Sequence, residues 1–216
     1  MQTRIEGRPA FCHIHVELEP GETIIAESGA MASMDSGLNV RAVFNGGLFV
    51  GLLRKVFGRE SLFVTRFTNV SSSCKRVTLT QVTPGEIAAR ELAGEAICLQ
   101  PGAYVCSTPE LKLGLRWAGF RSWFAREGLF KLQVSGTGTL WYGAYGALVE
   151  KTLQGEYIVD MSHLVAYDPH IRLRVQLAGG FFSSFLGGEG FVTRVEGHGK
   201  IVLQTRSLHG LSGWLK

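Results

Sequence analysis

The sequence predicts an all-β protein made of three tandem repeats, and three observations lead to this fold class. Glycine occupies 28 of 216 positions and charged residues only 19%, a composition typical of an apolar chain with many turns. A glutamate precedes an apolar, β-prone segment three times, and a Gly-Glu pair followed by alternating apolar residues stands upstream of each. Two markers kept in one order three times indicate internal repeats. The glutamate-led segments are 58–67, 126–132 and 188–195, and the Gly-Glu pairs are 21–22, 94–95 and 155–156.

The first predicted repeat spans roughly residues 5–74. Apolar and polar residues alternate from 12 to 19, which predicts a half-buried strand. Pro20-Gly21 predicts a turn, a strand is expected to begin at 23 and run toward 30–34, and another covers 61–69.

The second repeat, roughly 75–140, opens with a predicted strand over 75–83. Pro101-Gly102 predicts the turn of a hairpin over 97–105. A strand follows over 132–142, and its glycines indicate a bulge or a close backbone contact near 135–139.

The third repeat, roughly 141–209, has predicted strands over 156–166 and 172–177. Two more strands within 193–206 are expected to meet at a turn, Gly197-His198-Gly199. About 70 residues bury too little surface to be stable alone, and no linker interrupts the chain. The three repeats should therefore form a single domain over 1–216.

Four cysteines occur at spacings that match no zinc or redox motif, so they are expected to be reduced, small core residues. They are Cys12, Cys74, Cys98 and Cys106.

Each predicted repeat also contains a glycine-flanked apolar segment, at 44–57, 113–130 and 179–188. Large exposed apolar patches mark contacts with proteins or membranes. These apolar segments are therefore expected to contact a partner, a second copy of the chain or a membrane, and the alternative is that they fold back onto the core. The residues expected at the contact are Phe49, Leu52, Leu53, Trp117, Trp123, Phe124, Phe181, Phe182 and Phe185.

Several segments together resemble the AIM24 family, also called DUF124, over nearly the whole chain. The closest matches are HLVAYDP at 163–169, GEGF at 188–191 and VLQTRS at 202–207. The resemblance implies three repeats, each similar to a subunit of the tryptophan RNA-binding attenuation protein (TRAP), a short relative of the double-stranded β-helix. It also implies a ring-forming homotrimer. Eukaryotic relatives are mitochondrial proteins linked to inner-membrane organisation, and the family supplies no catalytic residues or cofactor.

One short motif indicates metal chemistry. Gly7-x5-His13-x-His15-x3-Glu19 has most of the spacing of the first cupin motif, and two histidines at alternate strand positions share a face. The alternative function is therefore a cupin-like metal-dependent enzyme or small-ligand binder that uses His13, His15 and Glu19. The other interpretation is that these residues form the wet side of an amphipathic strand. No second cupin motif follows, so no bound metal is expected.

The charge pattern excludes a nucleic-acid arm, since the net charge of +4 comes from interspersed residues. An RNA-binding ring is a second alternative, because basic residues interleave with aromatic ones at Arg116, Arg121, Arg126 and Lys131. The N-terminus has no apolar stretch of signal-peptide length, and no run of 18 apolar residues occurs. We expect a cytoplasmic protein, with peripheral attachment at the membrane through the apolar segments.

No nucleophile elbow, protease motif or phosphate-binding loop is present in the sequence. The leading hypothesis is a non-enzymatic scaffold or adaptor, without a cofactor, that forms a ring-like homotrimer.

Overall fold

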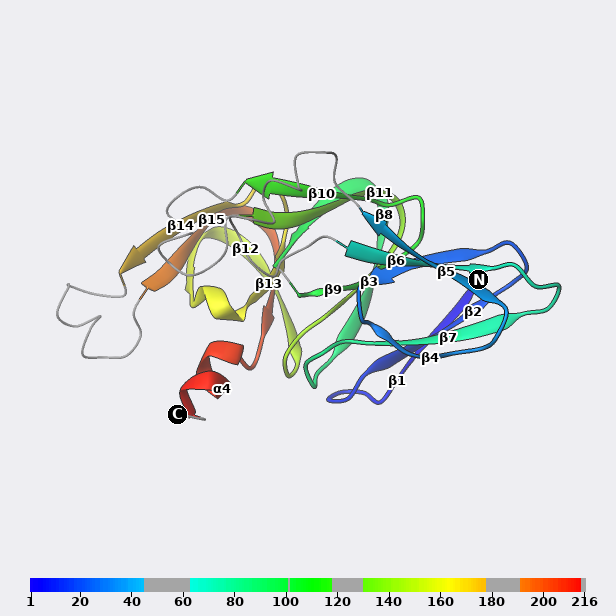
Figure 1. The fold of residues 1–216 in the computed structure, drawn as a ribbon. Coiled ribbons are helices and arrows are strands. Elements are labelled where there is room, and N and C mark those ends of the chain that lie inside the picture. The colour runs from blue at the N-terminus through cyan, green and yellow to red at the C-terminus, as the bar shows by residue number, and fades with distance from the viewer. Residues whose placement is uncertain (45–62, 101, 118–129, 178–190, 215–216) are drawn as a thin grey trace.

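The computed structural model describes residues 1–44, 63–100, 102–117, 130–177 and 191–214 (Figure 1). The predicted all-β class is confirmed: antiparallel strands make up nearly all of the regular structure in these ranges. The two helical elements described are the single 3₁₀ turn η1 (Met161–His163) and the tail helix α4 (Leu208–Trp214).

A four-stranded antiparallel sheet contains the N-terminus and lies at one end of the molecule (Figure 1). Its order is β1-β2-β7-β4. The strands are β1 (Gln2–Glu6), β2 (His13–Leu18), β4 (Met31–Met34) and β7 (Lys75–Thr80).

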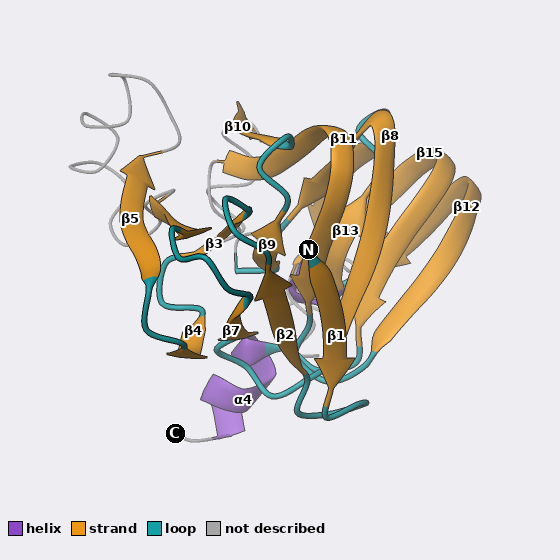
Figure 2. Ribbon diagram, turned by 90° about the vertical axis from the view of Figure 1, so that its right-hand side faces the viewer, coloured by secondary structure: helices purple, strands orange, loops and turns teal. Residues whose placement is uncertain are grey.

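The second sheet has eleven strands and follows the path β12-β15-β13-β8-β11-β9-β3-β6-β5, with β10 paired to β11 and β14 paired to β15. Figure 2 shows the long strands β8, β11, β12 and β15 side by side. The bounds are β3 (Thr23–Glu27), β5 (Leu38–Phe44), β6 (Phe63–Asn69), β8 (Ile87–Leu99), β9 (Tyr104–Ser107), β10 (Lys112–Trp117), β11 (Phe130–Gly143), β12 (Leu148–Val159), β13 (Leu164–Tyr167), β14 (Arg172–Leu177) and β15 (Phe191–Gln204).

β2 is a strand, as the alternation of apolar and polar residues in the sequence predicts, and its side chains alternate between buried and partly exposed. Ile14, Val16 and Leu18 are fully buried, whereas His13, His15 and Glu17 face outward. The buried side of β2 packs into a cluster with residues of β3, β6 and β7, among them Phe67 and Leu79. Two further clusters lie along β8 and β11 and along β12, β13 and β15.

Three hairpins have the same form, and each encloses most or all of one apolar segment of the sequence. They pair β5 with β6, β10 with β11, and β14 with β15. In the second segment, predicted over 113–130, residues 113–117 belong to β10 and Phe130 begins β11. The enclosed residues lie outside the described ranges, and so does the side chain of Trp117, the last residue of β10. The other residues predicted from sequence to contact a partner, a second copy or a membrane also lie outside the described ranges. They are Phe49, Leu52, Leu53, Trp123, Phe124, Phe181, Phe182 and Phe185.

The predicted turn at Gly197-His198-Gly199 is wrong, because β15 runs through it from Phe191 to Gln204. The reason for a glycine there is close approach. A Cβ at Gly199 would lie 2.7 Å from the Asp168 Oδ2 and 2.9 Å from the His170 Nε2. The glycine therefore makes room for the turn that follows β13.

The predicted hairpin about Gly102 is also wrong. β8 and β9 do not pair with each other, because β11 lies between them and pairs with both. By contrast, the irregularity predicted near 135–139 is confirmed, since the β8–β11 register shifts between Ser135 and Thr137. A Cβ at Gly138 would lie 2.2 Å from the Thr108 Oγ1.

Three of the four cysteines are buried, as predicted. Cys74 is exposed, so the prediction of a core position is wrong for this residue. Cys74 lies in the polar connection between β6 and β7, which belong to different sheets. A side chain in this connection is not packed against either core.

Candidate functional site

The two histidines of the cupin-like motif share the outer face of β2. Side chains at alternate positions of a strand point to the same side, and both rings are partly exposed. Their centroids lie 4.9 Å apart with the planes at 85°, so the edge of one ring meets the face of the other.

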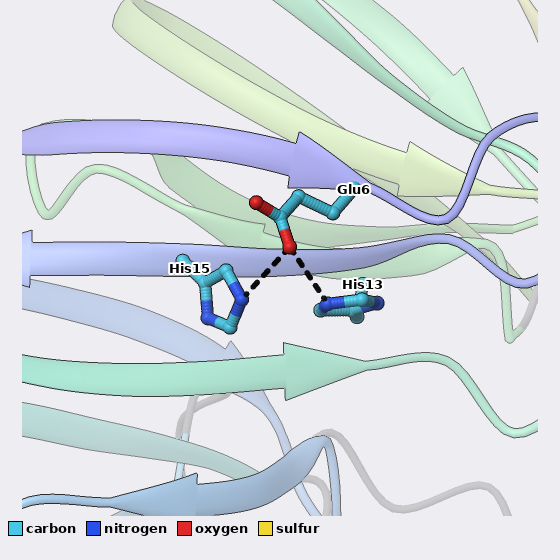
Figure 3. A group of neighbouring side chains, drawn as sticks. All are labelled: Glu6, His13 and His15. Atoms are coloured by element: carbon cyan, nitrogen blue, oxygen red, sulfur yellow. Dashed lines mark ion pairs between the residues drawn. The ribbon is translucent and has the colours of Figure 1, made fainter.

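Pairing of β1 with β2 adds a carboxylate to this face. In the antiparallel register Glu6 is opposite His13, and Arg4 is opposite His15. The Glu6 Oε2 lies 3.6 Å from the Nε2 of His13 and 3.4 Å from the Nε2 of His15 (Figure 3). One ligand atom from each of the three side chains falls within 4.8 Å of the others. We call Glu6, His13 and His15 the Glu6 cluster.

Glu19, the carboxylate assigned to this motif from sequence, does not join the histidines. It follows the end of β2, and its backbone N–H donates to the Glu22 Oε2 at 2.8 Å. Four residues of extended chain separate it from His15, a distance of about 13 Å. The spacing of residues in the sequence did not identify Glu6, because Glu6 comes beside the histidines through the pairing of β1 with β2 across a turn.

That turn depends on Gly7, which follows Glu6 directly. The Phe11 N–H donates to the Gly7 carbonyl at 3.0 Å, and Gly7 has a φ of 76°. A Cβ at this position would lie 2.2 Å from the Phe11 carbonyl oxygen. Glycine is therefore required for the turn that brings Glu6 beside His13.

A hydroxyl group from the neighbouring strand orients one of the rings. His15 is opposite Thr78 of β7, and its Nδ1 lies 3.0 Å from the Thr78 Oγ1. When Nδ1 carries the proton and donates to this oxygen, the Nε2 that faces Glu6 has a free lone pair.

Arg4 engages the other carboxylate oxygen of the Glu6 cluster. Its Nη2 lies 2.6 Å from the Glu6 Oε1. The oxygen that faces both imidazoles, Oε2, is not the atom held by this ion pair. Further along the same face, Arg76 pairs with Glu17 at 2.5 Å. The outer face of β1, β2 and β7 thus holds mixed charge.

Two other histidines, His163 and His170, take part in local structure. The His163 Nδ1 lies 2.7 Å from the Gln204 carbonyl oxygen, and the His170 Nε2 contacts the His198 carbonyl oxygen. Both contacts tie a turn to β15.

The basic and aromatic residues considered for RNA binding do not form a described surface. Lys131 is 2% exposed, and its Nζ donates to the Gln100 Oε1 at 2.7 Å. It therefore points into the protein. The side chains of Arg116, Arg121 and Arg126 are not described.

Within the described ranges, no helix has the length and apolar character needed to span a bilayer.

The chain is 28% identical over 225 aligned residues to an uncharacterized protein of Streptococcus pyogenes serotype M6, and the match covers 100% of this chain and 90% of the relative. A crystal structure of a Streptococcus pyogenes protein is also 28% identical, has a TM-score of 0.78 and matches over 99% of this chain and 98% of its own. The family model described as mitochondrial biogenesis AIM24 matches residues 3–206. The chain therefore belongs to the AIM24 family.

Proposed function

We propose that the protein is a non-enzymatic scaffold whose chains join head to tail into a closed homotrimeric ring. The observation that carries this proposal is a difference between three short strands. All four residues of β9 and all four of β13 are buried, whereas all four residues of β4 are exposed.

The three short strands have equivalent pairings within the chain. β4 pairs with β7, β9 with the second half of β11, and β13 with the second half of β15. Each ladder contains one register shift. The shifts lie between Met31 and Ser33 of β4, between Trp141 and Tyr142 of β11, and between Leu164 and Ala166 of β13. Together with the three similar hairpins, this recurrence supports three TRAP-like repeats. It favours boundaries after β7 and β11, slightly later than the ranges drawn from sequence.

Two of the short strands also pair with the preceding repeat. β9 pairs with β3 through Ser107 opposite Ile25 and Cys106 opposite Ala26. β13 pairs with β8 through Tyr167 opposite Cys98 and Ala166 opposite Leu99. These two junctions join the first repeat to the second and the second to the third.

The third junction has no partner within the described part of the chain. By strand register, Ile158 and Val159 at the end of β12 take the place of Cys98 and Leu99, because Val159 is opposite Thr193 as Leu99 is opposite Leu132. β12 ends the path of the eleven-stranded sheet, and β4 ends the four-stranded one. The two edges lie at opposite ends of the molecule (Figure 1).

A second copy of the chain satisfies both edges at once. In a head-to-tail contact, Ile158 of one copy is opposite Met34 of the next, and Val159 is opposite Ser33. Such a contact covers exposed apolar side chains and edge-strand hydrogen-bonding groups, which proteins otherwise protect. A heterologous contact that closes on itself gives a ring. The AIM24 resemblance supports three copies.

The ring also gives the apolar segments a role. Each apolar segment connects the two strands of one hairpin, so in the proposed repeats the segments leave and re-enter the sheet at equivalent strands. With the β-edges sealing the ring, the apolar segments are available for a membrane surface. Attachment of this kind grows with the apolar area buried and with nearby basic residues.

The assembly is tested first by the mass of the untagged protein in solution. Light scattering coupled to size exclusion should give three times the chain mass of 23.6 kDa. A mass of one chain at micromolar concentration would refute the ring and leave the exposed β4 edge unexplained.

A further inference from the structure

We propose that the Glu6 cluster binds a divalent transition-metal ion at the surface of the four-stranded sheet. This site is independent of the ring, because it lies on the outer face of β1 and β2 and uses neither β4 nor β12. The donors are two imidazoles and one carboxylate, a set that suits Zn²⁺, Co²⁺, Ni²⁺ and Fe²⁺ better than Mg²⁺ or Ca²⁺.

The distances within the cluster fit one ion. A metal about 2.0 to 2.2 Å from each ligand atom holds neighbouring ligand atoms roughly 3 to 3.5 Å apart. The Glu6 Oε2 is already 3.4 Å from the His15 Nε2 and 3.6 Å from that of His13. All three ligand atoms lie within 4.8 Å of one another, so the imidazoles turn about their side-chain torsions to complete the set, and their partial exposure leaves room for it.

Thr78 gives the site a second layer of support. Histidine ligands of metal ions commonly donate their other ring nitrogen to a neighbouring oxygen, which sets the tautomer and the ring orientation. The contact between the His15 Nδ1 and the Thr78 Oγ1 at 3.0 Å supplies this arrangement before any ion is bound. Thr78 is therefore a positioning residue, whereas His13, His15 and Glu6 are the ligands.

Two features set the strength and coordination of the site. The Arg4 guanidinium, 2.6 Å from the Glu6 Oε1, places a positive charge beside the ion and weakens binding. The partial exposure of all three ligands leaves the ion open to water, so three protein ligands are joined by solvent. We expect affinity in the micromolar range, with open coordination positions available to a small anionic or neutral ligand.

The experiment titrates Zn²⁺ into untagged, chelator-treated protein by isothermal calorimetry at pH 7.5. The expected result is one ion per chain, with no heat from Mg²⁺. His13→Ala and His15→Ala should abolish binding, Glu6→Gln should weaken it at least tenfold, and Thr78→Val should weaken it about tenfold. Arg4→Gln should strengthen it. Glu19→Gln is the matched control and should bind as the wild type does.

A measurement on the unaltered protein makes the test independent of variant folding. Addition of Co²⁺ should broaden the imidazole proton resonances of His13 and His15 in the NMR spectrum before those of His163, His170 and His198. Absence of saturable binding, or binding that persists unchanged in Glu6→Gln, would overturn the assignment. Equal broadening of all the histidines would overturn it as well.

Discussion

Cys98 in β8 is opposite Tyr167 in β13, and both side chains are buried, with exposures of 0% and 6%. In the proposed repeats the equivalent residues are Ile158 and Met34, whose exposures are 54% and 41%. The equivalent side chains are thus buried where the next repeat of the same chain pairs with them, and exposed where no described strand of the chain does so. This contrast is the basis for placing a second copy at β4.

A lysine at the proposed junction should dissociate the ring. Met34→Lys or Ile158→Lys puts a charge on an edge that must pair with another chain, which is how proteins prevent edge-to-edge association. Light scattering should report the mass of a single chain for both variants. Val82→Lys is the matched control, because Val82 is 94% exposed and belongs to neither β4 nor β12. Loss of assembly in the control, or full assembly in both edge variants, would argue against this junction.

The apolar segments should affect membrane binding and leave the ring intact. Replacing Trp117, Trp123 and Phe124 together by Ser removes apolar area that the proposal assigns to a membrane surface. In flotation with anionic phosphatidylglycerol vesicles, we expect the wild type to float and the triple variant to remain in the dense fraction. Its mass by light scattering should be unchanged. Dissociation of the triple variant would instead assign the apolar segments to the contacts between chains.

Glu27 should make the stability depend on pH. It ends β3, and burial raises the pKa of its carboxyl from 4.5 to about 6. The folded protein therefore binds the proton more tightly than the unfolded chain does, and the free energy of unfolding falls as the pH rises from about 4.5 to about 6.

Glu27→Gln removes this dependence. The substitution should raise the free energy of unfolding by about 1 to 2 kcal/mol at pH 7.5 and change it little at pH 4.5. Urea denaturation at both pH values, at one protein concentration, measures the difference. Glu110→Gln, at an exposed position, should have no effect at either pH. A stabilisation of Glu27→Gln that is the same at both pH values would contradict the desolvation argument.

Gly138 is needed for close packing as well as for its backbone conformation. It has a φ of 152°, and a Cβ there would meet the Thr108 Oγ1 at 2.2 Å. Gly94 also has a positive φ, of 107°, but a Cβ there would have no neighbour within 4 Å. Gly138→Ala should therefore destabilise the protein more than Gly94→Ala, by about 1 to 3 kcal/mol. Equal melting temperatures for the two variants would show that Thr108 moves aside at no cost.

The local alternation of β2 and the turn signals were enough to predict the all-β class, since both depend on neighbouring residues. The hairpin assigned around Gly102 failed because β8 and β9 pair with a distant strand, β11, and local sequence does not report such a partner. The turn predicted at Gly197-His198-Gly199 was wrong for a related reason. Gly199 leaves room for Asp168, which lies 31 positions away in the sequence. Long-range pairing was the missing information in both cases.

The same limit applies to the candidate metal site. His13 and His15 could be placed on one face from their spacing, because alternation is a local property. Glu6 could not be identified in the same way, since its place beside His13 follows from the turn at Gly7 and the β1–β2 register. The repeat boundaries near 74 and 140 and the contact residues of the apolar segments stay predictions.

Cross-linking the proposed junction tests the ring most directly. Met34→Cys and Ile158→Cys are combined in one chain with Cys74→Ser, which removes the exposed native thiol. Paired strands bring opposite Cβ atoms within disulfide reach. The head-to-tail ring predicts that mild oxidation gives covalent trimers on non-reducing gels, which a reductant returns to single chains, while each single-cysteine variant gives dimers at most. An oligomer by light scattering that yields no covalent trimer from the double variant would contradict the proposed β12–β4 junction.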